Sequence, residues 1–543
     1  MKQLMILGLA FALLLTAQSA VAQEANEVEL LRKQMQEMHR AFEEQQQLYQ
    51  QQLQAMQKQV DRLVDGNKKE TPPNSPPPTD TSSVISVDPF AAPTGASSAA
   101  PASSPDFKSW RPTDPIRLRS GNAQLDIGLT GTFVAGGSTT SEIGELNPGG
   151  HDPSGRGFSV QGIEASFLGS IDPYFQGSAN LNFALAADGE TFVEVEEAWL
   201  ESMSLPWNFQ VRAGQMYSDF GRHNSQHVHA WSFVDQPLAV SRLLGADGMR
   251  NPGARASWLA PMPWFTEFSF TLQNSGGGTA SSFRGSGHSH GDEEEEELPF
   301  GFRHQDNDRG VRSFGDMLFN PRLATSFNIT DTHTLLLGGS AAFGPNNSGG
   351  GGETDTRIYG ADLTWKWQSR NHDRGFPFVS LQSEFLARNY ELGSFDWDED
   401  GNGGDGDGDT FVDEGILTDP VTGLPAIVAP ETVSDYGLYS QFLYGFKPGW
   451  VAGLRFDYLF GDRANYEVRG LGLADGAGGI DAVGLDLERG NRYRISPNLT
   501  YYPSEFSKIR LQYNYDDRDQ IGIDHSLWLQ FEMSLGAHSA HRF

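Results

Sequence analysis

Residues 509–516 read Ile-Arg-Leu-Gln-Tyr-Asn-Tyr-Asp, so apolar and aromatic side chains alternate strictly with polar and charged ones. This alternation predicts a β-strand that presents one face to an apolar medium and the other to a polar one. Residues 123–133, 359–367 and 454–460 repeat the pattern. Each run has about 10 residues, the length of a tilted strand that crosses a bilayer.

From about residue 120 onward we expect sixteen strands, which begin near residues 123, 158, 174, 191, 208, 253, 264, 321, 334, 356, 376, 434, 450, 491, 506 and 525. The even-numbered connections between them are short, whereas most odd-numbered connections are long, as at 219–252 and 391–433. A barrel in an outer membrane has short turns on one side and long loops on the other. A soluble β-propeller is the alternative, but it predicts repeated blade motifs, which we do not find.

Four segments follow from changes in composition along the chain. Residues 1–22 have a short apolar core that ends in small residues, which predicts a signal peptide; an uncleaved anchor is the alternative. Residues 23–64 carry a heptad pattern that predicts a periplasmic coiled coil, with a lone amphipathic helix as the alternative. Residues 65–118 are rich in Pro, Ser and Ala and predict a linker, and residues 119–543 form the barrel.

The predicted fold class is therefore all-β: a transmembrane antiparallel up-and-down β-barrel of about 16 strands, preceded by an N-terminal α-helical coiled coil. We expect the barrel in the outer membrane of a Gram-negative-type bacterium, in contact with lipid and lipopolysaccharide, and the N-terminal region in the periplasm. The helix at 24–64 predicts a possible homotrimer and a possible contact with peptidoglycan.

Composition excludes several classes of protein. The 543 residues include no cysteine, which rules out disulfides, thiolate metal sites and thiol nucleophiles. Asp and Glu number 70 against 39 Lys and Arg, and a net charge of -31 argues against a nucleic-acid partner. A mean hydropathy of -0.44 excludes a bundle of membrane helices. Without a Gly-x-Ser-x-Gly motif or a phosphate loop, we expect no enzyme and no organic cofactor, and an outer-membrane phospholipase is the alternative.

Several short motifs carry a resemblance to a known family. They are VEVEEAWL at 193–200, RAGQ at 212–215, FGRHN at 220–224, QHVH at 226–229, FVDQPL at 233–238 and SLGAHSAHRF at 534–543. With these motifs the chain resembles the porin-sized outer-membrane proteins often labelled zinc-regulated, TonB-dependent outer-membrane receptors. In outline it is also similar to the phosphate-selective porins.

This resemblance implies an outer-membrane barrel with a role in the acquisition of metal, with Zn²⁺ as the cargo. A true TonB-dependent receptor has a plug domain and a TonB box near its mature N-terminus, where this chain has a heptad helix and a proline-rich spacer. A TonB-dependent metal receptor and a structural tether between outer membrane and cell wall are the alternatives to a channel.

Three groups of residues are candidate metal ligands. The third outer loop holds His223, His227, His229 and Asp235, imidazoles and a carboxylate that suit a zinc-type cation; hydrogen bonding within the loop is the alternative. The fourth outer loop adds a second zinc-type set, His288, His290 and His304, beside a run of acidic residues. A Ca²⁺ loop, with Ca²⁺ as a structural ion, is predicted from carboxylates at alternate positions: Asp396, Asp398, Asp400, Asp405, Asp407, Asp409, Asp413 and Glu414.

The polar faces of the predicted strands indicate what lines the lumen. The alternation places Asp126, Glu164, Glu194, Glu196, Asp362, Arg455, Asp457, Arg510 and Glu532 there. Most of these side chains are acidic, which predicts a preference for cations. We also expect the third outer loop to fold into the lumen and narrow it. The sequence therefore predicts a porin-like channel with cation preference that takes up zinc or another divalent metal.

Overall fold

The computed structural model describes residues 116–170, 172–185, 191–285, 311–349, 354–396, 427–462, 472–474, 480–482, 490–519 and 521–536. The predicted signal peptide and coiled coil lie outside the described residues, as does all of the predicted linker up to residue 115.

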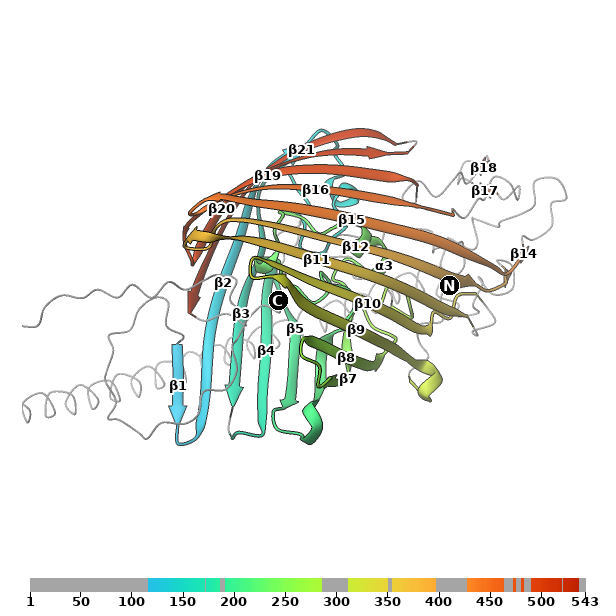
Figure 1. Ribbon diagram of the computed structural model, residues 1–543. Helices are drawn as coiled ribbons and strands as arrows, with labels where there is room; N and C mark the ends of the chain where they lie inside the picture. The colour runs from blue at the N-terminus through green and yellow to red at the C-terminus, as the bar shows by residue number, and fades with distance from the viewer. Residues whose placement is uncertain are drawn as a thin grey trace, which may run out of the picture. The chain divides into compact units, whose positions relative to one another are not determined.

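Sixteen antiparallel strands form the wall of a closed barrel (Figure 1). Each strand pairs with the next one in the chain, and the first, β2, also pairs with the last, β21. The strands are β2 (Ala123–Ser138), β3 (Gly157–Ser170), β4 (Phe175–Leu185), β5 (Thr191–Ser202), β6 (Phe209–Tyr217), β7 (Arg250–Leu259), β8 (Phe265–Asn274), β9 (Met317–Thr330), β10 (His333–Pro345), β11 (Asp355–Asp373), β12 (Phe376–Leu392), β15 (Glu431–Lys447), β16 (Trp450–Gly461), β19 (Arg492–Ser504), β20 (Ser507–Arg518) and β21 (Gly522–Gly536). The predicted barrel is confirmed, and every predicted strand start lies within four residues of the observed one.

One more strand, β1 (Ile116–Ser120), extends this sheet. It pairs with Ala123–Ile127 of β2, whereas β21 pairs with β2 only from Gly128 onward. Strand β1 therefore begins inside the stretch predicted as linker. Two small hairpins, β13 (Phe395–Asp396) with β14 (Ile427–Val428) and β17 (Gly472–Ala474) with β18 (Ile480–Ala482), belong to the long connections between wall strands.

The two faces of the wall differ in polarity, as the alternation predicts. On β21, Leu527, Leu529, Phe531 and Met533 are exposed on the outer face, whereas the side chains between them are buried in the interior. An exterior of large apolar side chains suits lipid and not water. Among the described residues, no helix is long and apolar enough to cross a membrane.

Two of the long connections fold inside the barrel. We call residues 139–156, with α2 (Ile143–Leu146), the first loop, and residues 218–249, with η3 (Val228–Ala230) and α3 (Leu238–Leu244), the inner loop. Helix α3 packs on the inner faces of β12, β15 and β16 (Figure 1). Its buried leucines form an apolar core with wall side chains such as Ile358 and Leu386. The third outer loop thus folds into the lumen, as predicted.

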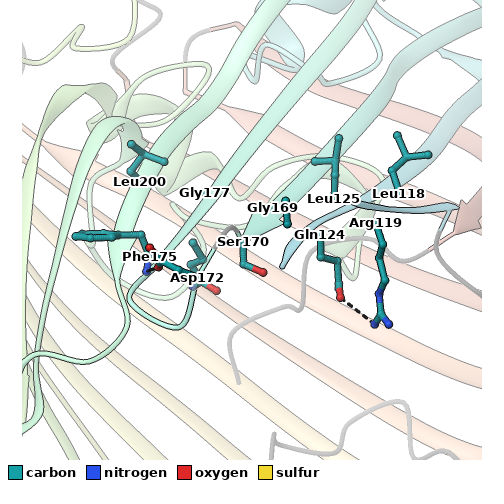
Figure 2. A pocket seen from close by; sticks show the side chains of 12 residues that line it. Leu118, Arg119, Gln124, Leu125, Gly169, Ser170, Asp172, Phe175, Gly177 and Leu200 are labelled. Atoms are coloured by element: carbon teal, nitrogen blue, oxygen red, sulfur yellow. Dashed lines mark hydrogen bonds between the residues drawn. The ribbon is translucent and has the colours of Figure 1, made fainter. Parts of the chain in front are cut away.

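A groove of about 640 Å³ lies on the barrel wall at its short-turn end (Figure 2). The side chains of Leu118, Leu125, Phe175 and Leu200 line it, and Arg119 donates a hydrogen bond of 3.0 Å to Gln124 at its edge. Because these leucines and Phe175 belong to the outer face, the groove is separate from the polar interior.

Strands β2 and β21 meet at a seam, and a substitution there tests how tightly the barrel closes. A Cβ added to Gly136 would lie 2.1 Å from the Leu527 carbonyl oxygen and 2.5 Å from the Trp528 ring. The Gly136→Leu substitution should therefore destabilise the barrel by about 1–3 kcal/mol, because backbone atoms must shift. Denaturant unfolding of the refolded protein measures this change.

The matched control is Gly339→Leu on the exposed outer face of β10, where no atom lies within 4 Å of the added Cβ. Equal stability of the two variants would contradict a tight seam at Gly136.

Candidate functional site

The carboxylate of Asp235 fixes the inner loop to one side of the barrel. It is completely buried and forms ion pairs with Arg455 (2.8 Å) and Arg494 (2.6 Å) from β16 and β19. Gln512 and Asn514 of β20 donate two further hydrogen bonds to it, of 2.6 Å and 3.0 Å. These four side chains satisfy both oxygens of Asp235, so this carboxylate acts as an anchor.

Other contacts tie the inner loop to the rest of the wall. The Gly221 amide donates to Ser340 Oγ on β10 (3.1 Å), and the His223 amide donates to Glu384 Oε1 on β12 (2.7 Å). Arg510 on β20 donates to two loop carbonyl oxygens, those of Trp231 and Phe233, each at 2.9 Å. The inner loop is therefore bonded to strands on several sides of the lumen.

Two histidines of the inner loop meet carboxylates of the wall. His227 Nδ1 lies 2.7 Å from Glu196 and its Nε2 lies 3.2 Å from Glu197, while His229 Nδ1 lies 2.7 Å from Glu164. The two imidazole rings stack with their centres 5.8 Å apart. We call these five residues the His227 cluster. It joins the middle of the inner loop to β3 and β5.

A β-bulge on β5 brings two adjacent carboxylates to this cluster. Asn180 of β4 pairs with Glu197, whereas the next residue, Leu181, pairs with Val195, so Glu196 is an extra residue on β5. A bulge interrupts the alternation of side chains, which lets neighbouring residues face the same side. Glu196 and Glu197 both point inward for this reason, and both contact His227.

The charges around His227 and His223 have opposite effects on their imidazoles. Burial lowers the pKa of His227, but the Glu164 and Glu196 carboxylates outweigh it and hold this pKa well above its usual value. Burial and the Arg455 charge lower the pKa of His223 to about 3, although Asp235 opposes them. His223 is therefore neutral, and the carboxylates around His227 favour a cation, either a proton or a metal ion.

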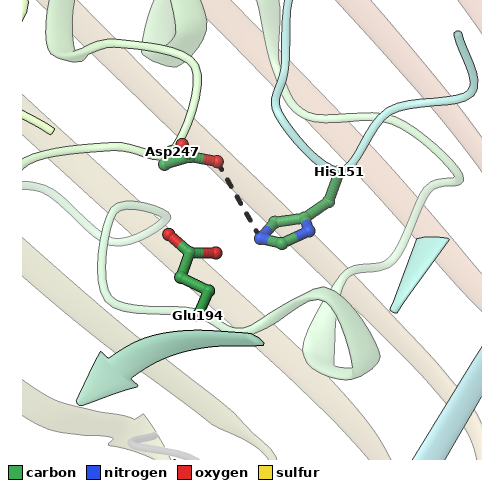
Figure 3. Close-up of side chains that lie close together, drawn as sticks. All are labelled: His151, Glu194 and Asp247. Carbon is green, nitrogen blue, oxygen red and sulfur yellow. Dashed lines mark ion pairs between the residues drawn. The ribbon is translucent and has the colours of Figure 1, made fainter. Parts of the chain in front are cut away.

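The predicted zinc ligands of the third outer loop do not form one cluster. Among the described residues, the ligand atoms of His, Asp and Glu converge in two groups: Glu164, Glu196 and His227, and His151, Glu194 and Asp247 (Figure 3). Of the four predicted ligands only His227 belongs to a group, and Asp235 is saturated by arginines. The other predicted metal ligands lie outside the described side chains: His288, His290, His304, Asp396, Asp398, Asp400, Asp405, Asp407, Asp409, Asp413 and Glu414.

The predicted lumen residues all lie in the interior, but their charges are paired. Each of the seven carboxylates has a basic partner: Asp126 with Arg117, Glu164 with His229, Glu194 with Arg250, Glu196 with His227, Asp362 with Arg322, Asp457 with Arg455 and Glu532 with Lys508. The alternation alone did not single out interior cations such as Arg250, Arg322 and Arg494. Cation preference consequently stays a prediction, and it cannot follow from a simple excess of acidic residues.

A polar cavity of about 290 Å³ lies between the inner loop and the wall formed by β3 to β7. Its charged and titratable lining residues are Glu197, Arg212, Tyr217, Asp219, Arg222, His227, His229 and Arg255. The His227 cluster thus borders this polar cavity, because His227, His229 and Glu197 belong to its lining.

No known protein-family model matches the sequence. An uncharacterized protein of Aquifex aeolicus (strain VF5) is 27% identical over 448 residues, which cover 77% of this chain and 79% of that protein. Among solved structures, the outer membrane channel DcaP of Acinetobacter baumannii is similar with a TM-score of 0.45 and 12% identity, over 77% of this chain and 99% of that one. An anion-selective porin from Comamonas acidovorans gives a TM-score of 0.42 and 8% identity, over 76% and 99% of the two chains.

With TM-scores of 0.45 and 0.42, these similarities do not establish the fold, which we assign from the strand pairing described above. None of these three descriptions names a zinc-regulated or TonB-dependent receptor, so that part of the sequence resemblance stays a prediction.

The Asp235 anchor gives a stability test. Asp235→Ala should destabilise the protein by about 3–5 kcal/mol, because it removes one partner of a buried network of charges. Asp331→Ala is the matched control, since Asp331 pairs with Arg370 at the surface, where the two side chains are 87% and 74% exposed. The control should change stability by less than about 1 kcal/mol. Denaturant unfolding measures both variants, and a loss of similar size in both would show that Asp235 is no anchor.

Proposed function

We propose that this protein is an outer-membrane channel of the porin type, in which the inner loop narrows the passage. The observation that carries this proposal is the inner loop itself, anchored across the lumen of a closed barrel with an apolar exterior and a polar interior. A barrel of sixteen strands leaves an interior wide enough for solutes, and an inward loop restricts which of them pass.

The polar cavity beside the inner loop marks the path for small hydrophilic solutes. Its lining mixes carboxylates, guanidinium groups and imidazoles over about 290 Å³. Apolar side chains of α3 fill the opposite side of the lumen, toward β12, β15 and β16, and offer water no such surface. Passage is therefore expected along β3 to β7.

The interior carboxylates differ in their basic partners, and this difference supports cation preference. Asp362 and Asp457 bind guanidinium groups, whose charge is permanent. Glu164 and Glu196 bind histidines instead, and an entering cation can displace a proton from an imidazole. The His227 cluster is thus a place in the described lumen where an entering cation can bind.

The transported solute in this proposal is a divalent metal ion, with zinc as the first candidate. Imidazole and carboxylate ligands together suit zinc and other first-row metals. A trimer through residues 24–64, a peptidoglycan contact and a Ca²⁺ site at 396–414 concern parts of the chain outside the described residues, and they stay predictions.

Planar bilayers with the purified protein test the channel. We expect stepwise conductance and, in a salt gradient, a reversal potential that indicates cation preference. Glu197→Gln removes a carboxylate from the polar cavity and should lower this preference several-fold, because less negative charge faces the path.

Glu142→Gln is the control, since it removes the same charge from an exposed position of the first loop. It should leave the reversal potential unchanged. A wild-type protein without conductance would overturn the channel, and anion preference in the wild type would overturn the role given to the His227 cluster.

A further inference from the structure

Three side chains from three separate segments point toward one another (Figure 3), and one of them, His151, lies 3.3 Å from Glu196 of the His227 cluster. His151 comes from the first loop, Glu194 from β5 in the wall and Asp247 from the end of the inner loop. One ligand atom of each lies within 4.8 Å of those of the other two. Both His151 and Asp247 are buried, and Glu194 is nearly so.

The orientation of the His151 ring leaves one nitrogen turned to this group. Its Nδ1 lies 3.2 Å from the carbonyl oxygen of Gln161, which accepts the N–H of the Nδ1 tautomer, and 3.3 Å from Asn182 Nδ2. Nε2 lies 3.9 Å from Asp247 and 3.3 Å from Glu196 but has no well-aligned hydrogen-bond partner among the described residues. A histidine that binds a metal usually donates its other N–H to a carbonyl in this way.

Gln161 holds this position because of a second bulge. Thr132 of β2 pairs with Gly162 and the next residue, Phe133, pairs with Val160, so Gln161 is an extra residue on β3. Its side chain donates to the carbonyl oxygens of His151 (2.9 Å) and Val234 (2.8 Å). One residue of the wall therefore fixes both loops beside each other.

The carboxylate of Glu194 has an oxygen available to a cation, and Asp247 is held beside it by the contact between the two loops. Glu194 accepts from Arg250 with Oε1, while its Oε2 is buried and has no hydrogen-bond partner among the described residues. The Gly150 amide donates to the Ala246 carbonyl oxygen (3.0 Å), which brings the first loop against the end of the inner loop. A Cβ on Gly150 would lie 2.0 Å from Asp247 Oδ1, so glycine makes room for this carboxylate.

Charge and space at this point both suit a divalent cation. Three carboxylates, those of Glu194, Glu196 and Asp247, meet here, and two basic side chains pair with them: Arg250 with Glu194 and His227 with Glu196. With His151 neutral, one negative charge remains in excess, and it favours a cation at this point. A cavity of about 10 Å³ adjoins His151 and Asp247, with the neutral His223 on its edge, and this volume holds about one water-sized particle.

We propose that His151, Glu194 and Asp247 form a binding site for one divalent first-row transition-metal ion, which fastens the first loop and the inner loop to the barrel wall. One imidazole with two carboxylates suits Zn²⁺, Mn²⁺, Fe²⁺ or Co²⁺, whereas Ca²⁺ and Mg²⁺ prefer oxygen ligands alone. Metal–ligand distances of about 2.0–2.2 Å require the three side chains to close by roughly an ångström. The bound ion is a permanent part of the protein and not the transported solute. This proposal therefore does not depend on whether the channel carries metal.

Metal binding by the full-length protein in detergent tests the site. The background variant replaces His288, His290 and His304 by alanine, which removes the histidines of the fourth outer loop. After treatment with a chelator, calorimetric titration should show one Zn²⁺ or Co²⁺ bound per chain, and Ca²⁺ should bind at least tenfold more weakly. His151→Ala and Asp247→Asn should each weaken the Zn²⁺ affinity at least tenfold.

Two control variants locate the ion. His227→Ala alters the neighbouring cluster, and His525→Ala alters an exposed histidine bonded to Tyr513 on the outer face. His525→Ala should keep the Zn²⁺ affinity within about threefold of the background, which corresponds to less than about 0.7 kcal/mol. His227→Ala should still bind one Zn²⁺ per chain. Loss of binding in His227→Ala with full binding in His151→Ala would overturn the proposal, as would the absence of stoichiometric binding.

X-ray absorption spectroscopy uses the Zn²⁺ complex of the background protein. It therefore tests the site even if the site variants do not fold. A shell of nitrogen and oxygen atoms with one or two imidazoles supports the site, and three or more imidazoles would contradict it. Conductance is measured in parallel on the same variants. A channel that conducts without stoichiometric metal binding refutes only the site, and a protein that binds metal without conducting refutes only the proposed channel.

Discussion

The arrangement inside the barrel depends on one buried carboxylate, that of Asp235, and on the two arginines beside it. Removing three charges from water costs several kcal/mol each unless every donor and acceptor is satisfied. Asp516 and Asp457 complete the network, because they pair with Arg494 at 2.5 Å and with Arg455 at 2.8 Å. The inner loop can lie across the lumen because the wall offers it this fully bonded set of partners.

The interior carboxylates fall into two kinds according to their basic partner. Those on the side of β9 to β21 pair mostly with arginine, whose charge does not change, so they hold the structure in a fixed state. Glu164 of β3 and Glu196 and Glu197 of β5 pair instead with histidines of the inward loops, whereas Glu194 of β5 pairs with Arg250. Burial by itself lowers the pKa of His151, but the carboxylates of Glu196, Asp247 and Glu194 outweigh it and raise this pKa to about 9. A cation of some kind is needed on this side of the lumen.

Alternation of side chains was enough to predict the barrel and the start of each strand, because one face meets lipid and the other does not. It also placed Glu164, Glu194 and Glu196 inside. It could not show that Gln161 and Glu196 are bulged residues, since a bulge is defined by the pairing between strands. By simple alternation Glu197 belongs to the outer face, and in the structure it contacts His227.

The ligand groups were harder to predict than the wall. His151 lies in the first loop without any neighbouring histidine, and nothing in the local sequence links it to Asp247, 96 residues later. Proximity of His223, His227, His229 and Asp235 in the sequence suggested a common site. In the structure the backbone is extended on either side of η3, and Asp235 reaches β16 and β19 while His227 and His229 reach β3 and β5. Contacts between distant segments decide which of these groups meet.

The sequence distances within the Asp235 network carry a consequence for assembly. Asp235 is separated from Arg455 by 220 residues and from Arg494 by 259 residues. The inner loop can therefore reach its final position only after the last third of the chain is in place, and contacts of such long range form late. Since β2 closes the ring with β21, the ring closes at the same stage at which the inner loop makes its final contacts. The two inward loops and the barrel wall around them would then form in one concerted step of folding. Errors in the loops therefore delay closure of the wall.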